Sequence, residues 1–359
     1  MLSVAAYSLD LPRYACARLR LLAPAQALGG RVALRWACRS DGADYAIDAS
    51  ALDGADLVVF QRHFPMRETW PLVERALSGP APVLYDLDDN YLDVPPDHPM
   101  ADRLAPVAPF ARELAARADL VTVSCPELAR ALTRNLSRDQ ARACTPVAVL
   151  PNLLEEALWR PATPDLSPDQ AEGPRPLRVV FAGTPTHRAD LEPLGPVLGR
   201  VARRFGPAVE MVFMGCDPPP GVPARGAPFL DGYADYARAL AALAPDIGLA
   251  PLADTPFNRC KSAVKWLEYS ALGAAGIYQD LPPYADVRHG MTGLKASTPE
   301  EWEDCLTRLL EDHALRRRLG GAARAEVLSR WGLAAGARRY LDCWLDAARR
   351  GRRPGGRNA

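Results

Sequence analysis

The sequence has no excess of either charge. Its 43 lysine and arginine residues balance 43 aspartate and glutamate residues, so the formal net charge at pH 7 is +0. Such a chain has no general electrostatic attraction to nucleic acid or to anionic lipid. A long hydrophobic run is also lacking, because no stretch approaches the roughly 20 apolar residues that span a bilayer. We therefore expect no nucleic-acid partner, and at most a peripheral association with membranes.

Metal-site and disulfide spacings are absent as well. The 8 cysteines are scattered from Cys16 to Cys343, and no two of them form a C-x-x-C pair. Reduced thiols, most of them buried, are the expected state. The N-terminus has no charged region before its apolar run, and Asp10 interrupts that run, so no signal peptide is predicted. These absences predict a cytoplasmic protein without a zinc site.

What the chain does contain is a repeated alternation of short apolar runs with helical patterns. Its 359 residues suffice for two domains with separate cores. Strands are predicted at Leu2–Ala6, Val32–Trp36, Leu57–Phe60, Val83–Tyr85, Leu120–Val123, Val147–Leu150, Leu177–Ala182, Val209–Met214, Ile247–Ala250 and Gly276–Gln279. Strands that alternate with helices are typical of a parallel, doubly wound α/β sheet.

One segment interrupts the alternation. Arg160–Pro176 is rich in proline and has no aromatic residue, which is typical of a linker. We therefore predict a first domain at 1–159, a linker at 160–176 and a second domain at 177–332. Helices are predicted at Pro299–Glu311, Ala314–Leu328 and Leu333–Arg350, and residues 351–359 form a basic tail that we expect to be disordered.

The most informative segment is Asn258–Gly273, which reads NRCKSAVKWLEYSALG. It lies between two apolar runs, so its pattern predicts a helix between two buried strands. At about 100° per residue, Lys261, Lys265 and Glu268 fall on one polar stripe of that helix. Two ammonium groups suit phosphate and a carboxylate suits a ribose diol, so the stripe indicates a nucleotide diphosphate site. The alternative is a solvated surface pair between Lys265 and Glu268.

A second candidate for an anion site follows the apolar run at Leu177–Ala182. Gly183, Thr184 and Thr186 lead from this strand into a helix, and Thr186 is the predicted N-cap. Small residues let the backbone approach a ligand, and the free N–H groups of a helix start favour an anion. Arg188 would add a positive charge, and His187 is either a phosphate donor or a surface histidine.

These segments resemble retaining GT-B glycosyltransferases of group 1 (GT4-like), in a branch with the donor-helix signature N-R-x-K-S-x-x-K-x-L-E-Y. Further segments match in order and cover nearly all of the chain: CARLRLLAPAQAL, YDLDDNYLDVPPDHP, VSCPELARAL, VLPN, AGTPTHRADLEPL, LPPY and GMTGLKA. The resemblance implies two Rossmann-like domains that face a cleft, with acceptor binding in the first and donor binding in the second. It also implies that Leu333–Arg350 crosses back to the first domain.

The resemblance also assigns residues to the donor. Lys261 and Lys265 would neutralise the departing nucleoside diphosphate, Glu268 would hold the ribose, and no metal or other cofactor is expected. The common family pattern has an earlier glutamate, and Cys260 occupies its position here. The full set of implied donor-binding residues is Gly183, Thr184, Thr186, His187, Arg188, Asn258, Arg259, Lys261, Ser262, Lys265, Glu268 and Tyr284.

The acceptor side is predicted from an acidic run that follows the strand at Val83–Tyr85. Asp88 and Asp89 would orient the acceptor hydroxyl or accept its proton. A metal-binding D-x-D, an aspartyl-phosphate nucleophile and simple helix capping are the alternatives. Three further residues are assigned to acceptor binding: Arg20, His63 and Asp86.

The predicted function is transfer of a sugar from a nucleotide-sugar donor to a hydroxyl group of a glycan, lipid-linked or protein acceptor. By resemblance, the reaction retains anomeric configuration and belongs to the synthesis of surface polysaccharide, O-antigen or another glycoconjugate. Two alternatives stay open. One is a nucleotide-sugar epimerase or hydrolase on the same fold, and the other is a non-catalytic subunit that binds sugar nucleotides or glycans.

Overall fold

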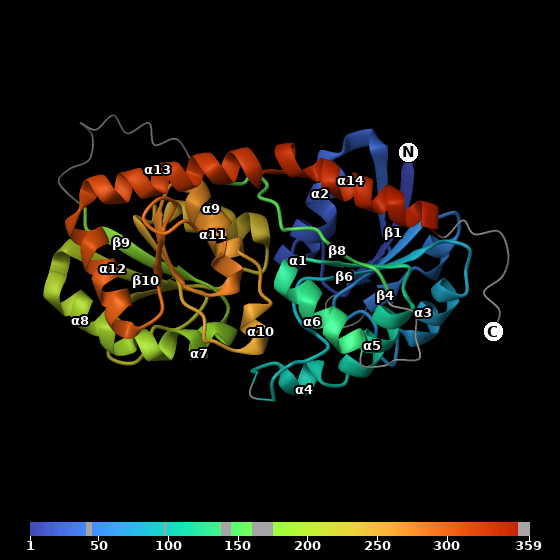
Figure 1. Cartoon of the computed structure of the whole chain (residues 1–359), viewed down its shortest axis with the longest axis horizontal. Coiled ribbons are helices and arrows are strands. Elements are labelled where there is room, and N and C mark those ends of the chain that lie inside the picture. Colours follow the sequence, from blue (N-terminus) through green and yellow to red (C-terminus); the bar gives the residue numbers. More distant parts are fainter. Residues whose placement is uncertain (41–44, 97, 138–144, 160–174, 351–359) are drawn as a thin grey trace. The chain divides into compact units, whose positions relative to one another are not determined.

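The structure is a computed structural model that describes residues 1–40, 45–96, 98–137, 145–159 and 175–350. The chain divides into two compact units (Figure 1). The first comprises Met1–Leu153, Arg259–Ser262 and the residues from Leu333 onward; the second comprises Leu154–Asn258 and Ala263–Gly332. Residues 160–174 of the predicted linker and the predicted tail at 351–359 lie outside the described residues.

The described part of the first unit is built on a six-stranded parallel sheet in the order β2-β1-β5-β6-β7-β8. The strands are β1 (Leu2–Tyr7), β2 (Val32–Trp36), β5 (Leu57–Gln61), β6 (Val83–Leu87), β7 (Leu120–Val123) and β8 (Val147–Val149). The order in which successive strands are added to the sheet reverses between β1 and β5. In α/β proteins, ligands bind at the carboxyl ends of the strands at such a point. The predicted strands of this half are confirmed.

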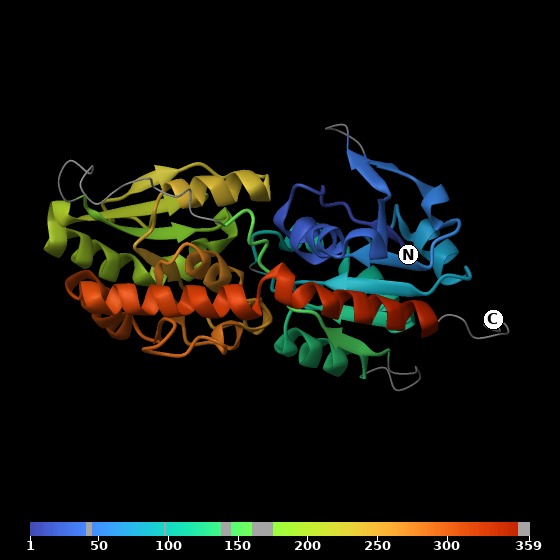
Figure 2. The same ribbon diagram turned by 90° about the horizontal axis from the view of Figure 1, so that it is seen from above.

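Helices cover both faces of this sheet. One face packs against α3 (Trp70–Leu77), α5 (Ala108–Arg117) and α6 (Pro126–Leu136). The other packs against α2 (Ala23–Ala27) and α14 (Leu333–Arg350), which also contact each other (Figure 1). In Figure 2 the same α14 runs alongside the sheet. A π-helical turn (Arg18–Leu22) joins α1 (Ala15–Ala17) to α2, and α4 (Ala101–Leu104) is a single short turn.

The alternation pattern did not predict the small hairpin of β3 (Cys38–Ser40) and β4 (Tyr45–Ile47). Its strands are short and largely exposed, so they lack the apolar run that marks a buried strand.

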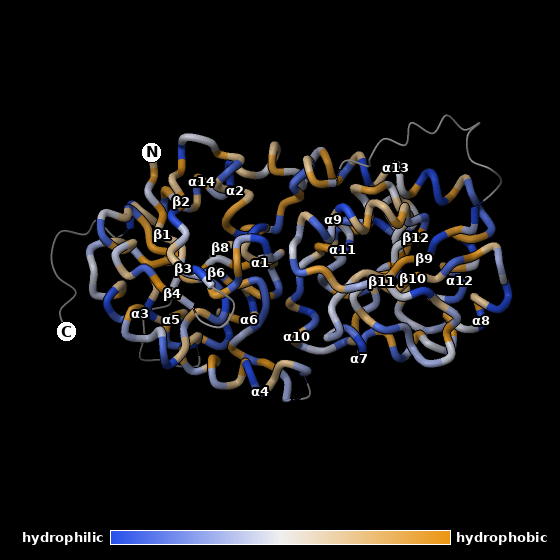
Figure 3. The backbone as a smooth tube through the Cα atoms, turned by 180° about the vertical axis from the view of Figure 1, so that it is seen from behind, coloured by the Kyte–Doolittle hydropathy of each residue, from blue (hydrophilic) through white to orange (hydrophobic). Residues whose placement is uncertain are grey.

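The second unit contains another six-stranded parallel sheet among its described residues, in the order β11-β10-β9-β12-β13-β14. Numbered along the unit, this is the 3-2-1-4-5-6 order of Rossmann folds, with its reversal point between β9 and β12. The strands are β9 (Leu177–Ala182), β10 (Val209–Met214), β11 (Arg225–Ala227), β12 (Ile247–Ala250), β13 (Ala275–Gln279) and β14 (Leu294–Ala296). Hydrophobic residues dominate the central strands of both sheets (Figure 3).

Helices also cover both faces of the second sheet. One face packs against α8 (Gly195–Phe205) and α12 (Pro299–Glu311), and α9 (Tyr233–Ala242) and α11 (Val264–Ala271) lie on the other. The helix α13 (His313–Arg330) contacts α11 and β13. Two short helices, α7 (Arg188–Leu191) and α10 (Pro256–Arg259), follow β9 and β12. Within the described residues, no helix has the length and apolarity needed to cross a membrane.

The prediction of one continuous donor helix is wrong. The segment forms α10 and α11, and Cys260–Ala263 between them is not helical. Tertiary contacts explain the break: Cys260 is buried in the core of the first unit, and its carbonyl oxygen accepts a hydrogen bond from the Cys125 thiol at 3.1 Å. Lys261 therefore does not share a helical stripe with Lys265 and Glu268, and it belongs to the first unit.

Candidate functional site

The loop after β9 is built around a glycine that no other residue can replace without a clash. A Cβ atom on Gly183 would lie 2.9 Å from Cζ of Phe181, 3.0 Å from Cδ2 of His187 and 3.0 Å from Nζ of Lys265. Because the three side chains converge on this backbone position, a ligand that approaches it meets one ammonium group and one imidazole. Three of the predicted donor-binding residues, Gly183, His187 and Lys265, therefore lie close together in the second unit.

The imidazole of His187 is held by a buried carboxylate. Its Nδ1 lies 2.6 Å from Oδ2 of Asp190, whose other oxygen accepts hydrogen bonds from the Ala253 backbone N–H at 2.7 Å and from Asn258 Nδ2 at 2.9 Å. Asn258, a predicted donor-binding residue, thus donates hydrogen bonds within the protein. Asp190 links the loops that follow β9 and β12, the two strands at the reversal point of the sheet.

Lys265 lies in the first turn of α11 and reaches back to β9. Its Nζ donates to the carbonyl oxygen of Ala182 at 2.8 Å and lies 5.3 Å from the centroid of the Phe181 ring. These contacts direct the ammonium group toward the carboxyl end of β9.

Glu268, one turn further along α11, is buried and held by two tyrosines of α9. The Tyr233 hydroxyl donates to Oε1 at 3.0 Å and the Tyr236 hydroxyl donates to Oε2 at 2.8 Å. Burial raises the pKa of Glu268 to about 7, although Lys265 and both hydroxyls act in the opposite direction. Trp159 packs edge-on against both tyrosine rings. In this structure the carboxylate is therefore engaged within the protein.

Several predicted donor residues are placed differently from expectation. Thr184, and not Thr186, is the N-cap of the turn after β9, and the two hydroxyl oxygens are 2.6 Å apart. Arg188 is exposed and pairs with Glu192 at 3.0 Å. Tyr284 is only 2% exposed and packs against the Tyr278 ring. Arg259 is exposed at the end of α10.

Arg20 and Asp86, which are predicted to bind the acceptor, form a buried ion pair in the first unit. Arg20 has no exposed surface, and its Nη2 lies 2.7 Å from Oδ1 of Asp86, which belongs to β6 and does not follow it. Arg20 also donates to Asn152 and to the Tyr340 hydroxyl of α14, both at 3.2 Å, and to the carbonyl oxygen of Leu150. This buried network ties helices to the sheet of the first unit and leaves neither charge for a ligand.

A different charged cluster occupies the reversal point of the first sheet. Arg62, which follows β5, forms an ion pair with Asp10 beyond β1 and another with Asp88 beyond β6, where Nε and Oδ1 are 3.0 Å apart. Arg62 has a φ of 54°, which is uncommon for a residue with a side chain. Such backbone strain is concentrated at functional sites. The predicted residues Asp88 and His63 both belong to this cluster.

Burial controls the protonation of this cluster. It raises the pKa of Asp88, with Arg62 opposing, and together with Arg62 it lowers the pKa of His63 to about 4. Burial alone would also raise the pKa of Asp10, but Arg62 and His63 outweigh it and hold the pKa below its ordinary value. His63 is therefore neutral near pH 7.

Asp89 and Lys261 form an ion pair in the first unit. Lys261 Nζ lies 3.8 Å from Asp89 Oδ1, and about a quarter of each side chain is exposed, 22% and 26% respectively. Ser262, the next residue, accepts a hydrogen bond from Asn152 Nδ2 at 2.9 Å. Asp89 is thus the more accessible of the two predicted catalytic aspartates, and a lysine balances its charge.

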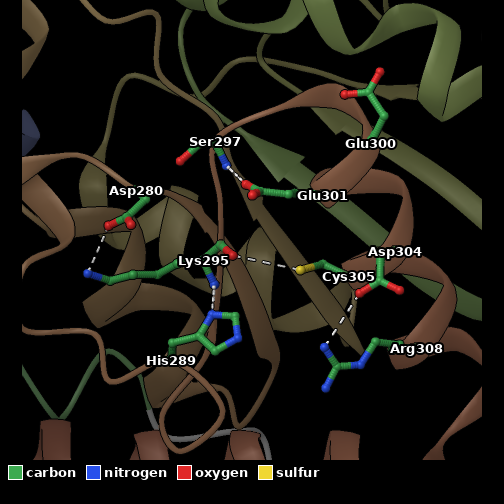
Figure 4. A pocket seen from close by; sticks show the side chains of 9 residues that line it. All are labelled: Asp280, His289, Lys295, Ser297, Glu300, Glu301, Asp304, Cys305 and Arg308. Atoms are coloured by element: carbon green, nitrogen blue, oxygen red, sulfur yellow. Dashed lines mark hydrogen bonds and ion pairs between the residues drawn. The ribbon is translucent and has the colours of Figure 1, made fainter.

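A pocket of about 590 Å³ in the second unit contains none of the predicted donor residues (Figure 4). It is lined by Asp280, His289, Lys295, Ser297, Glu300, Glu301, Asp304, Cys305 and Arg308. Most of its charged groups are already paired: Lys295 with Asp280, Arg308 with Asp304, and Glu301 with the backbone at the start of α12 (Figure 4). Across the residues that the structure describes, no group of three or more His, Cys, Asp or Glu side chains is arranged to hold a metal ion.

Sequence reasoning missed Asp190, Tyr233, Tyr236 and Arg62. Asp190 had a usable signal, because it follows His187 by one helical turn on the same loop. The others are distant in sequence from their partners, and only the fold brings them together.

The comparisons with known proteins concern the fold. No family model matches the sequence, and no curated protein does. Among solved structures, sucrose-phosphate synthase from Thermosynechococcus elongatus has a TM-score of 0.69 at 14% identity, covering 96% of this chain and 99% of that chain. HepE from Anabaena, in complex with UDP-glucose, has a TM-score of 0.64 at 16% identity, covering 97% and 100%.

A third similar structure is α,α-trehalose 6-phosphate synthase from Burkholderia multivorans, with a TM-score of 0.61 at 14% identity and 99% of each chain covered. Together with the two parallel sheets, these likenesses confirm the predicted fold class: the chain has the GT-B fold, made of two Rossmann-like units.

Proposed function

We propose that the protein is a glycosyltransferase that moves a sugar from a nucleotide-sugar donor to an acceptor hydroxyl. The observation that carries the proposal is the convergence of Lys265 and His187 on Gly183 at the carboxyl end of β9. A glycine flanked by cationic and imidazole groups suits a diphosphate. The likeness to HepE, which was crystallised with UDP and with UDP-glucose, supports a nucleotide-sugar as the ligand.

On the donor side, Lys265 stabilises the charge that builds on the departing nucleoside diphosphate. Such stabilisation lowers the barrier most when the group is already in place before the reaction. Glu268 receives the ribose diol once Tyr233 and Tyr236 exchange their hydrogen bonds for ribose hydroxyls. Because protein cations supply the positive charge, we propose that turnover needs no divalent metal.

On the acceptor side, we propose Asp89 as the residue that orients the hydroxyl or accepts its proton, with the Lys261 ammonium group 3.8 Å from its carboxylate. Asp88 is bound to Arg62, so its role is to fix the position of the acidic loop. Retention of configuration and a role in surface polysaccharide, O-antigen or other glycoconjugate synthesis follow from the sequence resemblance and belong to the same proposal.

A thermal-shift screen tests ligand class directly. The full chain is heated with UDP-, GDP-, dTDP- and CMP-linked sugars, each with and without EDTA. Ligand at about 100 times its Kd should stabilise the protein by about 2.7 kcal/mol. A shift with one donor that persists in EDTA is the expected result. No shift with any of the donors would contradict the proposal, and a shift abolished by EDTA would contradict metal independence.

Substitution of Lys265 tests its role in the reaction. With the donor found in the screen, Lys265→Met should lower kcat by about 10²-fold, because it removes a charge but keeps the apolar stem. Arg204→Met, which removes an exposed cation from α8, is the matched control and should keep most activity. Unchanged kcat in Lys265→Met would dismiss the proposed stabilisation of the leaving group.

One observation favours the non-catalytic alternative. Cys260 stands where the family pattern has a glutamate, and its side chain is 4% exposed in the core of the first unit. Burial also raises the pKa of Cys260 to about 12, so this thiol does not act as an anion near neutral pH. A protein that binds a donor tightly but neither transfers, hydrolyses nor isomerises it would support the alternative.

A further inference from the structure

Asp190, which contacts the His187 ring, has no part in the reaction proposed above, although both of its carboxylate oxygens have hydrogen-bond partners. Asp190 is 7% exposed, lies within hydrogen-bond distance of the His187 ring, and accepts hydrogen bonds from the Ala253 backbone N–H and the Asn258 side chain. We propose that Asp190 is a positioning residue that fixes the proton on Nδ1 of His187, so that the ring binds a phosphate oxygen of the donor only in its doubly protonated form. This inference rests on the proposed function.

The atoms around the His187 ring determine which of its two nitrogens carries the proton. Asp190 Oδ2 lies 2.6 Å from Nδ1 of His187, so an ionised carboxylate there requires a proton on Nδ1. Nε2 of a neutral ring then carries a lone pair, which repels a phosphate oxygen. Nε2 is bonded to Cδ2, the atom that lies 3.0 Å from the position of a Cβ on Gly183. The ring edge that must donate to phosphate therefore faces the glycine loop.

Proton uptake on ligand binding follows from this arrangement. The ionisable groups placed at the ring are Asp190 on its Nδ1 side and Lys265 from α11, whereas the exposed Arg188, next in the chain, pairs with Glu192. Lys265 disfavours a positive ring, whereas Asp190 favours it. A bound diphosphate adds negative charge on the side of Lys265 and tips this balance. Binding of the donor should then draw a proton onto His187 near neutral pH.

The test is to count the protons that the protein takes up when it binds a ligand. UDP and inorganic pyrophosphate are each titrated into the full chain by calorimetry at about pH 7, in buffers of different ionisation enthalpy. The change in apparent enthalpy between buffers reports the protons taken up per ligand. The wild type should take up a fraction of a proton beyond that bound by the ligand itself. His187→Asn should lose this fraction and bind more weakly.

Asp190→Asn separates positioning from mere support of the loop. Its oxygen can keep the two donors from Ala253 and Asn258, and its amide N–H₂ then faces Nδ1 of His187. The ring proton moves to Nε2, so a neutral ring can donate to phosphate. We expect binding to persist within about tenfold (about 1.4 kcal/mol), while the linked proton uptake disappears. Asp286→Asn, an exposed change of the same charge, is the control and should leave uptake unchanged.

Nitrogen NMR of the ligand-free chain gives an independent readout. The chain has only 5 histidines, so the ¹⁵N-labelled rings can be assigned by substitution. Neutral His187 should carry its proton on Nδ1 in the wild type and on Nε2 in Asp190→Asn. The inference is overturned if the wild-type proton is on Nε2, or if Asp190→Asn changes neither the tautomer nor the proton uptake. Failure of the wild type to bind UDP or pyrophosphate would instead refute the proposed function.

Discussion

Replacing Arg20 with methionine removes the cation from a fully buried ion pair, and we expect the first unit to lose about 3–5 kcal/mol of stability. Arg20 and Asp86 have side-chain exposures of 0% and 2%. Methionine fills much of the same volume, so the loss comes mainly from leaving the Asp86 carboxylate buried without its partner. The Thr122 hydroxyl, which donates to Asp86 at 2.7 Å, remains but carries no charge.

The matching double variant, Arg20→Met with Asp86→Leu, should recover most of this loss, because it removes both buried charges together. Thermal unfolding followed by circular dichroism is the assay. The single variant should lower Tm by roughly 6–20 °C, from about 2–4 °C per kcal/mol. Arg35→Met is the control, since Arg35 and Asp48 are about half exposed, 49% and 48%, and should contribute at most about 1 kcal/mol. A double variant as unstable as the sum of its single variants would refute the reasoning.

Three further outcomes are expected. Gly183→Ala places a methyl group 2.9 Å from Phe181 and should weaken UDP binding at least about tenfold, a loss of about 1.4 kcal/mol; equal affinity in calorimetry would contradict the close approach. Glu268 binds its proton more tightly when folded, because burial raises its pKa to about 7, so stability should fall by about 3 kcal/mol as pH rises from the ordinary value of 4.5 through 7. Glu268→Gln should flatten that fall in urea titrations across this range, and an unchanged slope would contradict a buried carboxyl. Thr298→Ala removes the capping box with Glu301 at the start of α12 and should cost about 1 kcal/mol, measured as a lower urea midpoint; an unchanged midpoint would show that the cap contributes nothing.

The sheet strands were predictable because parallel strands are covered on both faces. Strands such as β1, β5 and β9 are therefore continuous apolar runs, which the sequence displays directly. β11 and the hairpin of β3 and β4 were missed, because they are short and their exposed residues have no apolar pattern.

The candidate site was predictable only in part. The loop at Gly183 and the position of Lys265 follow from local sequence, since strand, turn and helix are consecutive. The break before α11 could not be read from helical periodicity, because contacts of Cys260 with the first unit cause it. The burial of Arg20 against Asp86, 66 residues away, likewise depends on long-range pairing that spacing does not encode.

The placement of α14 has a consequence for biosynthesis. Leu333, Tyr340, Leu341 and Trp344 complete the same hydrophobic core as Leu2 and Val4. A ribosome therefore releases the whole second unit before it delivers the residues that close the first one. Until then, the nascent first unit must expose the apolar face that α14 will cover, which is the kind of surface that chaperones bind during translation.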